Sequence, residues 1–407
     1  MTTDRQAHLE SSAGRYPVYL FFQKASYWGP VFFLYFSSVL TLPDVLVLEG
    51  IYYISVVLLE IPTGYLADRF GQRRVLIWSS IAQAIACAIF ILSGTFVELA
   101  AGQVFLALGM ALGSGSDTAY HFSILKDLGN EIEYGAREAK AARTLLISQA
   151  SSALIGGLIA IVDLRLAYVL SFMSASIAVV IATRFTETSI ERSAESVREK
   201  VRHCLREATN PRLAWLLVYF IYITVVNHIP HEFYQPVLEG MVSDFQRALP
   251  VTVATGFHTA LTMAVATVGA SLSIRIRDRF GATSALLCAG LLQTGIIASM
   301  VWIQSPIIAL ILALRSLPRG LMQAPLNAEV VPLVAETRRS TYLSIQSLLG
   351  RMSFGGVLLL LSTTFTGSDI VAPIQAAAIG AAVGLALLVT TIPLSRRQAE
   401  PSIRQVG

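Results

Sequence analysis

Charged side chains interrupt long apolar stretches of this chain, and their positions indicate where chemistry could occur. Lys24 and Glu60 lie at similar depth in neighbouring stretches, so they could form an ion pair. A charge in the middle of a bilayer costs about 2.5–3.5 kcal/mol and normally faces a cavity or a partner. The pair could switch with a proton or a charged cargo, or it could be structural, with Lys24 as a snorkelling lysine. Tyr27 follows Lys24 on the same stretch.

A third charge, Asp117, ends the run of small residues 113–116. Small residues allow close helix packing. Asp117 is therefore either a protonatable carboxylate or an interfacial residue.

Three arginines lie in the later apolar stretches. Arg315 and Arg319 are four residues apart, which predicts one shared helical face. Paired guanidinium groups facing a cavity would suit a cargo with an anionic group. Arg351 is a further candidate for binding cargo or for coupling. The alternative is that the arginines pair with Glu329, Asp117 or helix ends.

A polar cluster of His228, His231 and Glu232 lies in another apolar stretch, with His258 in the next. His228 and His231 are three residues apart and share a helical face. Imidazole titrates near neutral pH, which suits a proton relay, and it also ligates transition metals. The metalloprotease pattern of two histidines four residues apart is absent. A polar helix end, a proton relay and a metal site remain the three interpretations.

Aromatic residues crowd the first apolar stretch, and more follow in the second. They could line a pocket for an amphipathic molecule, or they could face lipid and the membrane interface. The residues are Phe21, Phe22, Tyr27, Trp28, Phe32, Phe33, Tyr35, Phe36, Tyr52 and Tyr53.

The elements that carry these residues are membrane helices. Apolar residues make up 54% of the 407 residues and charged residues only 14%, against about a quarter in soluble proteins. The apolar runs have about the 20 residues that a helix needs to cross ~30 Å of hydrocarbon. Since backbone groups in lipid must pair internally, the sequence predicts an all-α membrane protein. The predicted helices span residues 17–40, 45–66, 74–94, 97–120, 141–162, 164–184, 213–237, 250–273, 282–303, 306–328, 340–363 and 370–394.

The basic residues predict the orientation. If both termini are cytoplasmic, only Arg165 and Arg247 fall in outer segments, as the positive-inside rule requires. The predicted organisation is an N-terminal six-helix bundle, a linker, a C-terminal six-helix bundle and a cytoplasmic tail. The linker mixes charges of both signs and is interpreted as a solvated tether, with a surface helix as the alternative. These parts cover residues 1–184, 185–212, 213–394 and 395–407.

The tetrapeptide Asp68-Arg69-Phe70-Gly71 recurs at 278–281, each time in a polar turn between two apolar stretches. Such internal repeats are typical of transporters. The longer segment Gly64-Tyr65-Leu66-Ala67-Asp68-Arg69-Phe70-Gly71-Gln72-Arg73-Arg74 resembles the signature loop of the major facilitator superfamily, between its second and third helices. The resemblance implies two pseudo-symmetric six-helix bundles that rock around a cargo site near the bilayer midplane.

The resemblance also implies a conformational latch, in which Asp68 docks on the N-terminus of the helix at 340–363. Gly64 and Gly71 permit close approach and turning, and Arg69, Arg73 and Arg74 set the topology. The second copy has Ile274 in place of the leading glycine. Two marks of drug–proton antiporters are also missing: helix 4 carries Gln103 where those relatives have a basic residue, and no Gly-Pro pair precedes Gly156-Gly157.

The sequence has no Gly-x-x-x-x-Gly-Lys-Ser/Thr loop for ATP and no nucleophile beside a base. It therefore predicts a transporter of the bacterial inner membrane, not an enzyme. We expect a monomer without cofactor or nucleic-acid partner, driven by the proton gradient, that exports a small amphipathic or charged organic compound. The alternatives are proton-coupled uptake of an organic anion, movement of a metal or metal chelate, and a membrane receptor that does not transport.

Overall fold

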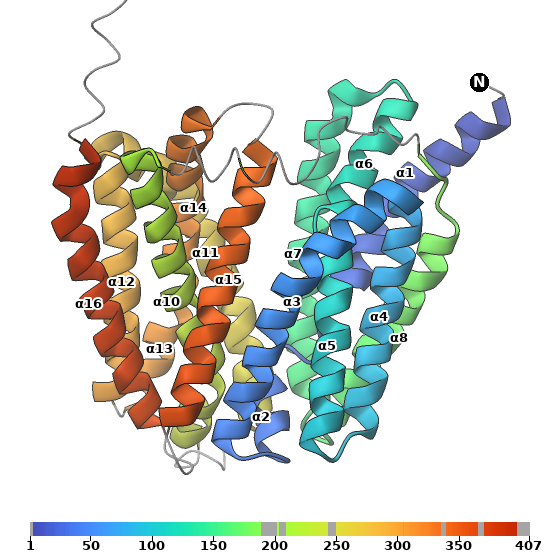
Figure 1. The fold of residues 1–407 in the computed structure, drawn as a ribbon. Helices are drawn as coiled ribbons and strands as arrows, with labels where there is room; N and C mark the ends of the chain where they lie inside the picture. Colours follow the sequence, from blue (N-terminus) through green and yellow to red (C-terminus); the bar gives the residue numbers. More distant parts are fainter. Residues whose placement is uncertain are drawn as a thin grey trace, which may run out of the picture. The chain divides into compact units, whose positions relative to one another are not determined.

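The computed structural model describes residues 3–188, 202, 209–242, 250–303, 305–334, 339–364 and 370–396. In this part of the chain every regular element is a helix, which confirms the predicted all-α class (Figure 1). The chain divides into two compact units. Unit 1 holds residues 1–192 and 245–260, and unit 2 holds residues 193–244 and 261–407.

Unit 1 is organised around α4, which packs against α5 and α8, while α3 packs against α5 (Figure 1). On the other side of the unit, α1 packs against α7 and α8. The elements of unit 1 are α1 (Thr3–Lys24), α2 (Phe32–Ser37), α3 (Leu42–Phe70), α4 (Gln72–Leu92), α5 (Phe96–Gly113), α6 (Ser116–Asp127), η1 (Glu131–Glu133), α7 (Tyr134–Ile159) and α8 (Arg165–Thr183).

Local sequence signals fix where several of these helices begin. Thr95 accepts a hydrogen bond from the Glu98 amide, and the Glu98 carboxylate accepts one from the Thr95 amide, which is a capping box at the start of α5. Gly71, with φ of 91°, separates α3 from α4. Only glycine adopts that backbone conformation without strain.

The aromatic residues of α2 form part of the core of unit 1. Phe32, Phe33, Tyr35 and Phe36 are buried and pack with Phe90 of α4 and Tyr168 of α8. The Tyr35 hydroxyl also donates a hydrogen bond to the Phe90 carbonyl. These four side chains are therefore core residues and do not face lipid, because the short α2 turns them inward.

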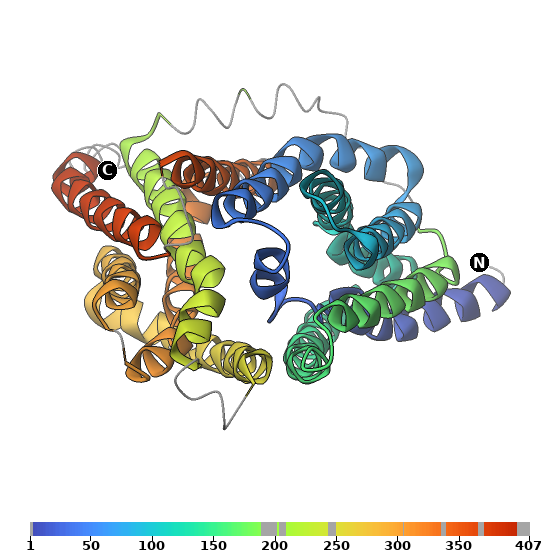
Figure 2. The same cartoon turned by 90° about the horizontal axis from the view of Figure 1, so that it is seen from below.

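Unit 2 is organised around α10, which packs against α12, α15 and α16 (Figure 2). Trp215 Nε1 donates to the Leu388 carbonyl at 3.1 Å, and the Tyr219 hydroxyl donates to the Leu286 carbonyl at 2.7 Å. The elements that follow the linker are α10 (Pro211–Val242), α11 (Val251–Phe280), α12 (Ala282–Trp302), α13 (Ile307–Ala313), α14 (Leu317–Val330), η3 (Val331–Leu333), α15 (Arg339–Thr364) and α16 (Val371–Arg396). The first residues of α11, up to 260, belong to unit 1.

Among the described residues, ten helical segments are long and apolar enough to cross a membrane, which makes this a multi-pass membrane protein. The predicted spans 17–40 and 141–162 do not meet these criteria. The first is divided between α1 and α2, and the apolar part of α7, Arg143–Ile159, is shorter. The count of twelve spans therefore stays a prediction.

Candidate functional site

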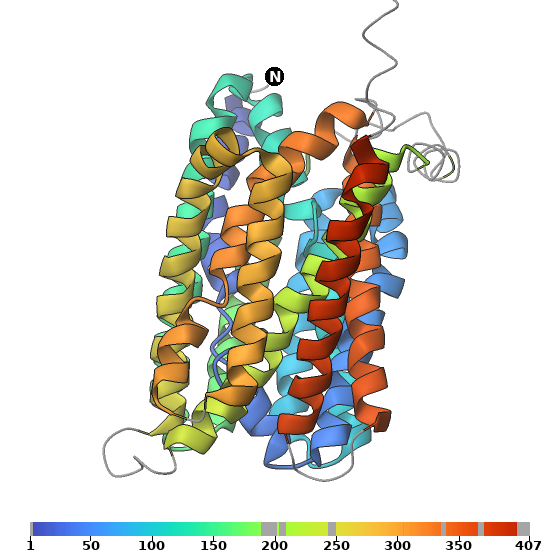
Figure 3. The same cartoon turned by 90° about the vertical axis from the view of Figure 1, so that its left-hand side faces the viewer.

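Three predicted spans are not continuous helices. The first breaks between α1 and α2, and the fourth at 114–115 between α5 and α6. The tenth breaks at 314–316 between α13 and α14, the orange helices in Figure 3. Backbone that leaves a helix at membrane depth is tolerated only inside the protein or along a water-filled cavity. Discontinuous helices are also where transporters place cargo and ion sites. The charges beside these breaks are therefore the first candidates for a functional site.

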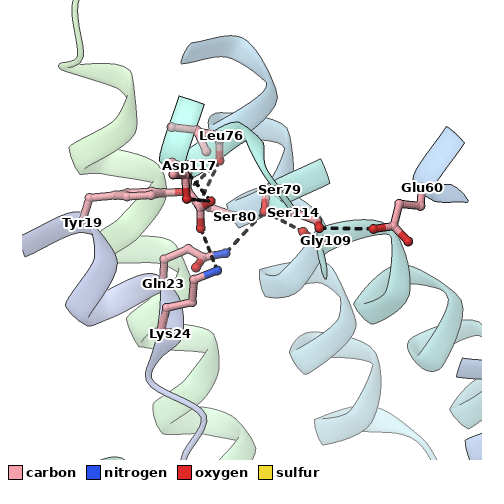
Figure 4. A network of polar contacts seen from close by, with 11 residues as sticks. Tyr19, Gln23, Lys24, Glu60, Leu76, Ser79, Ser80, Gly109, Ser114 and Asp117 are labelled. Atoms are coloured by element: carbon pink, nitrogen blue, oxygen red, sulfur yellow. Dashed lines mark hydrogen bonds and ion pairs between the residues drawn. The ribbon is translucent and has the colours of Figure 1, made fainter. Parts of the chain in front are cut away.

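In unit 1 the breaks bring two opposite charges together (Figure 4). Lys24 is the last residue of α1, and Asp117 lies in the first turn of α6. Lys24 Nζ lies 3.0 Å from Asp117 Oδ2, with side chains that are 21% and 16% exposed. The N-terminal end of a helix also favours a carboxylate. This pair joins the ends of two interrupted spans.

The predicted partner of Lys24 was Glu60, and this pairing is wrong. Glu60 Oε1 instead accepts a hydrogen bond from Ser114 at 3.3 Å (Figure 4). The reason is the break in span 4: the helix ends at Gly113, and Gly115 takes a left-handed conformation with φ of 74°. The chain then restarts with Asp117 directed at α1.

A hydrogen-bonded frame surrounds the ion pair. Gln23, beside Lys24, donates to Ser79 at 3.4 Å, and Ser79 donates to the Gly109 carbonyl at 2.7 Å. Ser80 donates to the Tyr19 hydroxyl at 3.4 Å (Figure 4). These contacts link α1, α4 and α5. None of these residues was predicted as part of a site, although two adjacent serines in an apolar run were a usable signal.

The break in span 1 rests on a glycine of α7. A Cβ added to Gly156 would overlap the Tyr27 carbonyl oxygen. The end of α1 is held from both sides, because Ser148 of α7 donates to the Phe21 carbonyl at 2.5 Å and Ser174 of α8 donates to the Phe22 carbonyl at 2.8 Å. Gly156 therefore determines how closely the break, and Lys24 before it, can approach α7.

We expect Gly156→Ala to destabilise the protein, because the added methyl group would displace the Tyr27 backbone. Overpacking of this kind costs about 1–3 kcal/mol, which a lower melting temperature in detergent would show. Gly295→Ala is the matched control, since Gly295 lies within α12 and an added Cβ meets nothing within 4 Å. That change should be neutral or slightly stabilising. Equal melting temperatures for the two variants would contradict the close approach.

In unit 2 the central residue is Arg315, which lies in the break of span 10 and is only 4% exposed. Its NH1 donates to Thr262 Oγ1 at 2.9 Å and to the Leu312 carbonyl at 3.4 Å. Its Cζ lies 3.9 Å from the centre of the Tyr234 ring, a cation–π distance. The Tyr234 hydroxyl accepts a hydrogen bond from Gln235 at 3.1 Å. The guanidinium is thus fixed by α10, α11 and the end of α13.

The other basic candidates in unit 2 differ from Arg315 in burial. Arg319 is exposed on α14, so the predicted single helical face with Arg315 is wrong, because the chain is not helical between 313 and 317. Arg351 is partly buried on α15. His228 Nδ1 lies 2.7 Å from the Thr224 carbonyl oxygen, and its ring lies 4.8 Å from that of Phe354.

The remaining histidine cluster does not form a metal centre in the described part of the chain. His231 is exposed and Glu232 is buried in unit 2, whereas His258 is buried in unit 1. Over the described ranges no group of three or more His, Cys, Asp or Glu side chains could hold a metal ion. The metal alternative therefore has no ligand cluster to support it there.

The repeated turn has the same geometry in both copies. Gly71 ends α3 with φ of 91°, and Gly281 ends α11 with φ of 82°. In the first copy Arg69 stacks on Phe70, Arg74 is exposed, and Arg73 donates to the Thr183 carbonyl at 2.7 Å. The side chain of Asp68 lies outside the described residues, so the latch on α15 stays a prediction.

Comparison with known proteins gives the family. The family model of the Major Facilitator Superfamily matches residues 30–360. No curated protein sequence matches this chain.

Solved structures confirm the same fold. The crystal structure of the nucleoside transporter NupG is similar with a TM-score of 0.77 and 13% identity, covering 95% of this chain and 98% of that one. The crystal structure of the peptide transporter POT in complex with sulfate is similar with a TM-score of 0.74 and 12% identity, and the match covers 94% of each chain. The structure of a bacterial homolog of the human lysosomal transporter Spinster has a TM-score of 0.66 and 16% identity. That match covers 97% of this chain and 96% of the other.

At such low identity the structural likeness establishes only the fold. The family itself is established by the match of the family model, which extends over most of the sequence. The chain therefore belongs to the Major Facilitator Superfamily and is a transporter, not an enzyme.

Proposed function

We propose that this protein is a proton-coupled secondary transporter of a small organic molecule that carries an anionic group. The observation that carries the proposal is Arg315, a buried arginine in the break of a membrane span. Burying a charge in a membrane protein is expensive, and the residues that remain buried are normally functional. This favours a charged organic cargo over a purely amphipathic one.

The surroundings of Arg315 suit recognition of an anion. A guanidinium has five donors in a planar fork that matches a carboxylate or a phosphate. The hydrogen bonds to Thr262 and Leu312 both come from NH1, and Tyr234 lies against the face of the group. These contacts fix the plane of the fork. A preorganised fork loses less entropy when it binds.

The Lys24–Asp117 pair supports proton coupling. We propose Asp117 as the coupling carboxylate, because its protonation would cancel the attraction to Lys24, 3.0 Å away. The ends of two interrupted spans would then separate more easily. The proton gradient would supply the energy, and we retain export as the proposed direction, in the inner membrane, with cytoplasmic termini and a monomeric protein.

The related structures are consistent with an organic cargo. Two of them are named as transporters of nucleosides and of peptides, which are polar organic molecules. In this protein Asp68 is proposed to act as the latch that closes the cytoplasmic side, as the resemblance of its loop implies.

Thermal unfolding of the detergent-purified protein against a ligand panel tests the proposed cargo class. The panel holds organic anions, nucleosides, peptides, lipophilic cations and Zn²⁺, each at two pH values. A ligand that binds the native state stabilises it in proportion to the logarithm of its concentration above the dissociation constant. We expect organic anions to raise the melting temperature. Stabilisation by lipophilic cations or by Zn²⁺ alone would contradict the proposal.

A further inference from the structure

The chain that follows α8 stays on unit 1 instead of leaving it. Residues 184–188, here called the strap, belong to unit 1 and include the buried residues Phe185 and Thr188. The predicted linker begins at 185 and was interpreted as a solvated tether. That interpretation is wrong for 185–188, and residues 189–201 and 203–208 of the linker lie outside the described part of the chain.

The strap is hydrogen-bonded to α1. The Thr186 amide donates to Ser12 Oγ at 2.9 Å, and Thr186 Oγ1 donates to the His8 carbonyl at 3.1 Å. Arg15 donates to the Arg184 carbonyl at 3.2 Å. The backbone of the strap is therefore paired along the first part of α1.

Aromatic packing attaches the strap to α6 as well. The Phe185 ring lies 4.8 Å from that of Tyr120 in a stacked arrangement and 5.3 Å from that of Tyr19 edge-on. The Tyr120 hydroxyl donates to the Thr186 carbonyl at 3.1 Å. Phe185 is only 4% exposed, so the strap buries an anchor residue in the core of the unit.

The third attachment is to the turn between α3 and α4. Arg73 NH1 lies 4.0 Å from Glu187 Oε2, and Thr188 Oγ1 donates to Gln72 Oε1 at 3.4 Å. A Cβ added to Gly71 would overlap Glu187 Oε1. The signature glycine therefore does more than turn the chain, because its missing side chain leaves the space that the Glu187 carboxyl group occupies.

We propose that the strap is a clasp, held by the turn at 71–73, that ties the ends of α1, α4, α6 and α8 into one body. This inference does not depend on the identity of the cargo or on proton coupling. It assigns the signature turn a partner within its own unit, in addition to the proposed Asp68 latch.

Hydrogen exchange of the full-length protein in detergent tests the clasp, with the Thr186 amide as the reporter. We expect Ser12→Ala, which removes the acceptor of this amide, to speed its exchange about tenfold. Ser176→Ala is the matched control, because the Ser176 hydroxyl bonds only within α8, to the Phe172 carbonyl. Equal exchange in the wild type, Ser12→Ala and Ser176→Ala would overturn the proposal.

Discussion

Arg315→Gln should abolish the stabilisation by an organic anion and lower its transport by at least about 100-fold. The reason is that the side chain supplies the buried positive charge in the break of span 10. A hydrogen bond to a charged group contributes about 1.5–3 kcal/mol. Two parallel bonds from a guanidinium to a carboxylate are therefore together equivalent to roughly two to four powers of ten in affinity. Binding to the purified protein and uptake into proteoliposomes measure the two effects separately.

Two further variants separate a binding role from a folding role. Arg319→Gln removes the same charge from an exposed position on α14, so it should leave binding almost unchanged. Arg315→Lys keeps the charge but loses the planar fork, so it should recover little of the affinity. The melting temperature without ligand shows whether each variant is folded. A folded Arg315→Gln protein that binds the anion as the wild type does would refute the proposed site.

The positions of the helices could be predicted from the sequence because run length and apolarity are strong signals. The predicted span 282–303 corresponds to α12 at Ala282–Trp302, and 340–363 corresponds to α15 at Arg339–Thr364. The turns at Gly71 and Gly281 were also predictable, since the same Asp-Arg-Phe-Gly tetrapeptide lies between two apolar stretches in each copy.

The helix breaks could not be predicted in the same way, because apolarity does not report backbone continuity. Residues 113–116 were interpreted as small residues for packing, yet the helix ends at Gly113 and restarts at Ser116. In span 10 the break at 314–316 precedes Pro318. Pro318 is the second residue of α14, and the first turn is where a helix tolerates proline.

The pairing of side chains could not be predicted from the sequence. Lys24 and Glu60 were matched by depth alone, whereas the direction of each side chain around its helix depends on packing and on the breaks. The strap was missed for a related reason. A segment of mixed charge is typical of a solvated linker, and only the apolar Phe185 indicated that its first residues would be buried.

Asp117→Asn should uncouple transport from the proton gradient while leaving cargo exchange intact. The variant cannot lose or gain the carboxyl proton, so concentrative transport driven by a pH gradient should disappear. Exchange of labelled for unlabelled cargo needs no net proton movement and should continue. The unliganded protein should also lose about 1–3 kcal/mol of stability, since Lys24 loses its partner. This is less than the roughly 3–5 kcal/mol for a fully buried pair, because both side chains are partly exposed.

Asp163→Asn is the control for the coupling prediction, because Asp163 is an exposed carboxylate of the same unit that accepts a hydrogen bond from the Arg165 amide. It should retain pH-driven accumulation. The double variant Lys24→Gln with Asp117→Asn should regain much of the lost stability, since no unpaired charge remains, but it should not regain coupling. Stability and coupling would then depend on different properties of one ion pair: stability on matched charges, and coupling on a carboxyl group that can exchange a proton. Concentrative transport by Asp117→Asn at the wild-type rate would show that the coupling proton binds elsewhere.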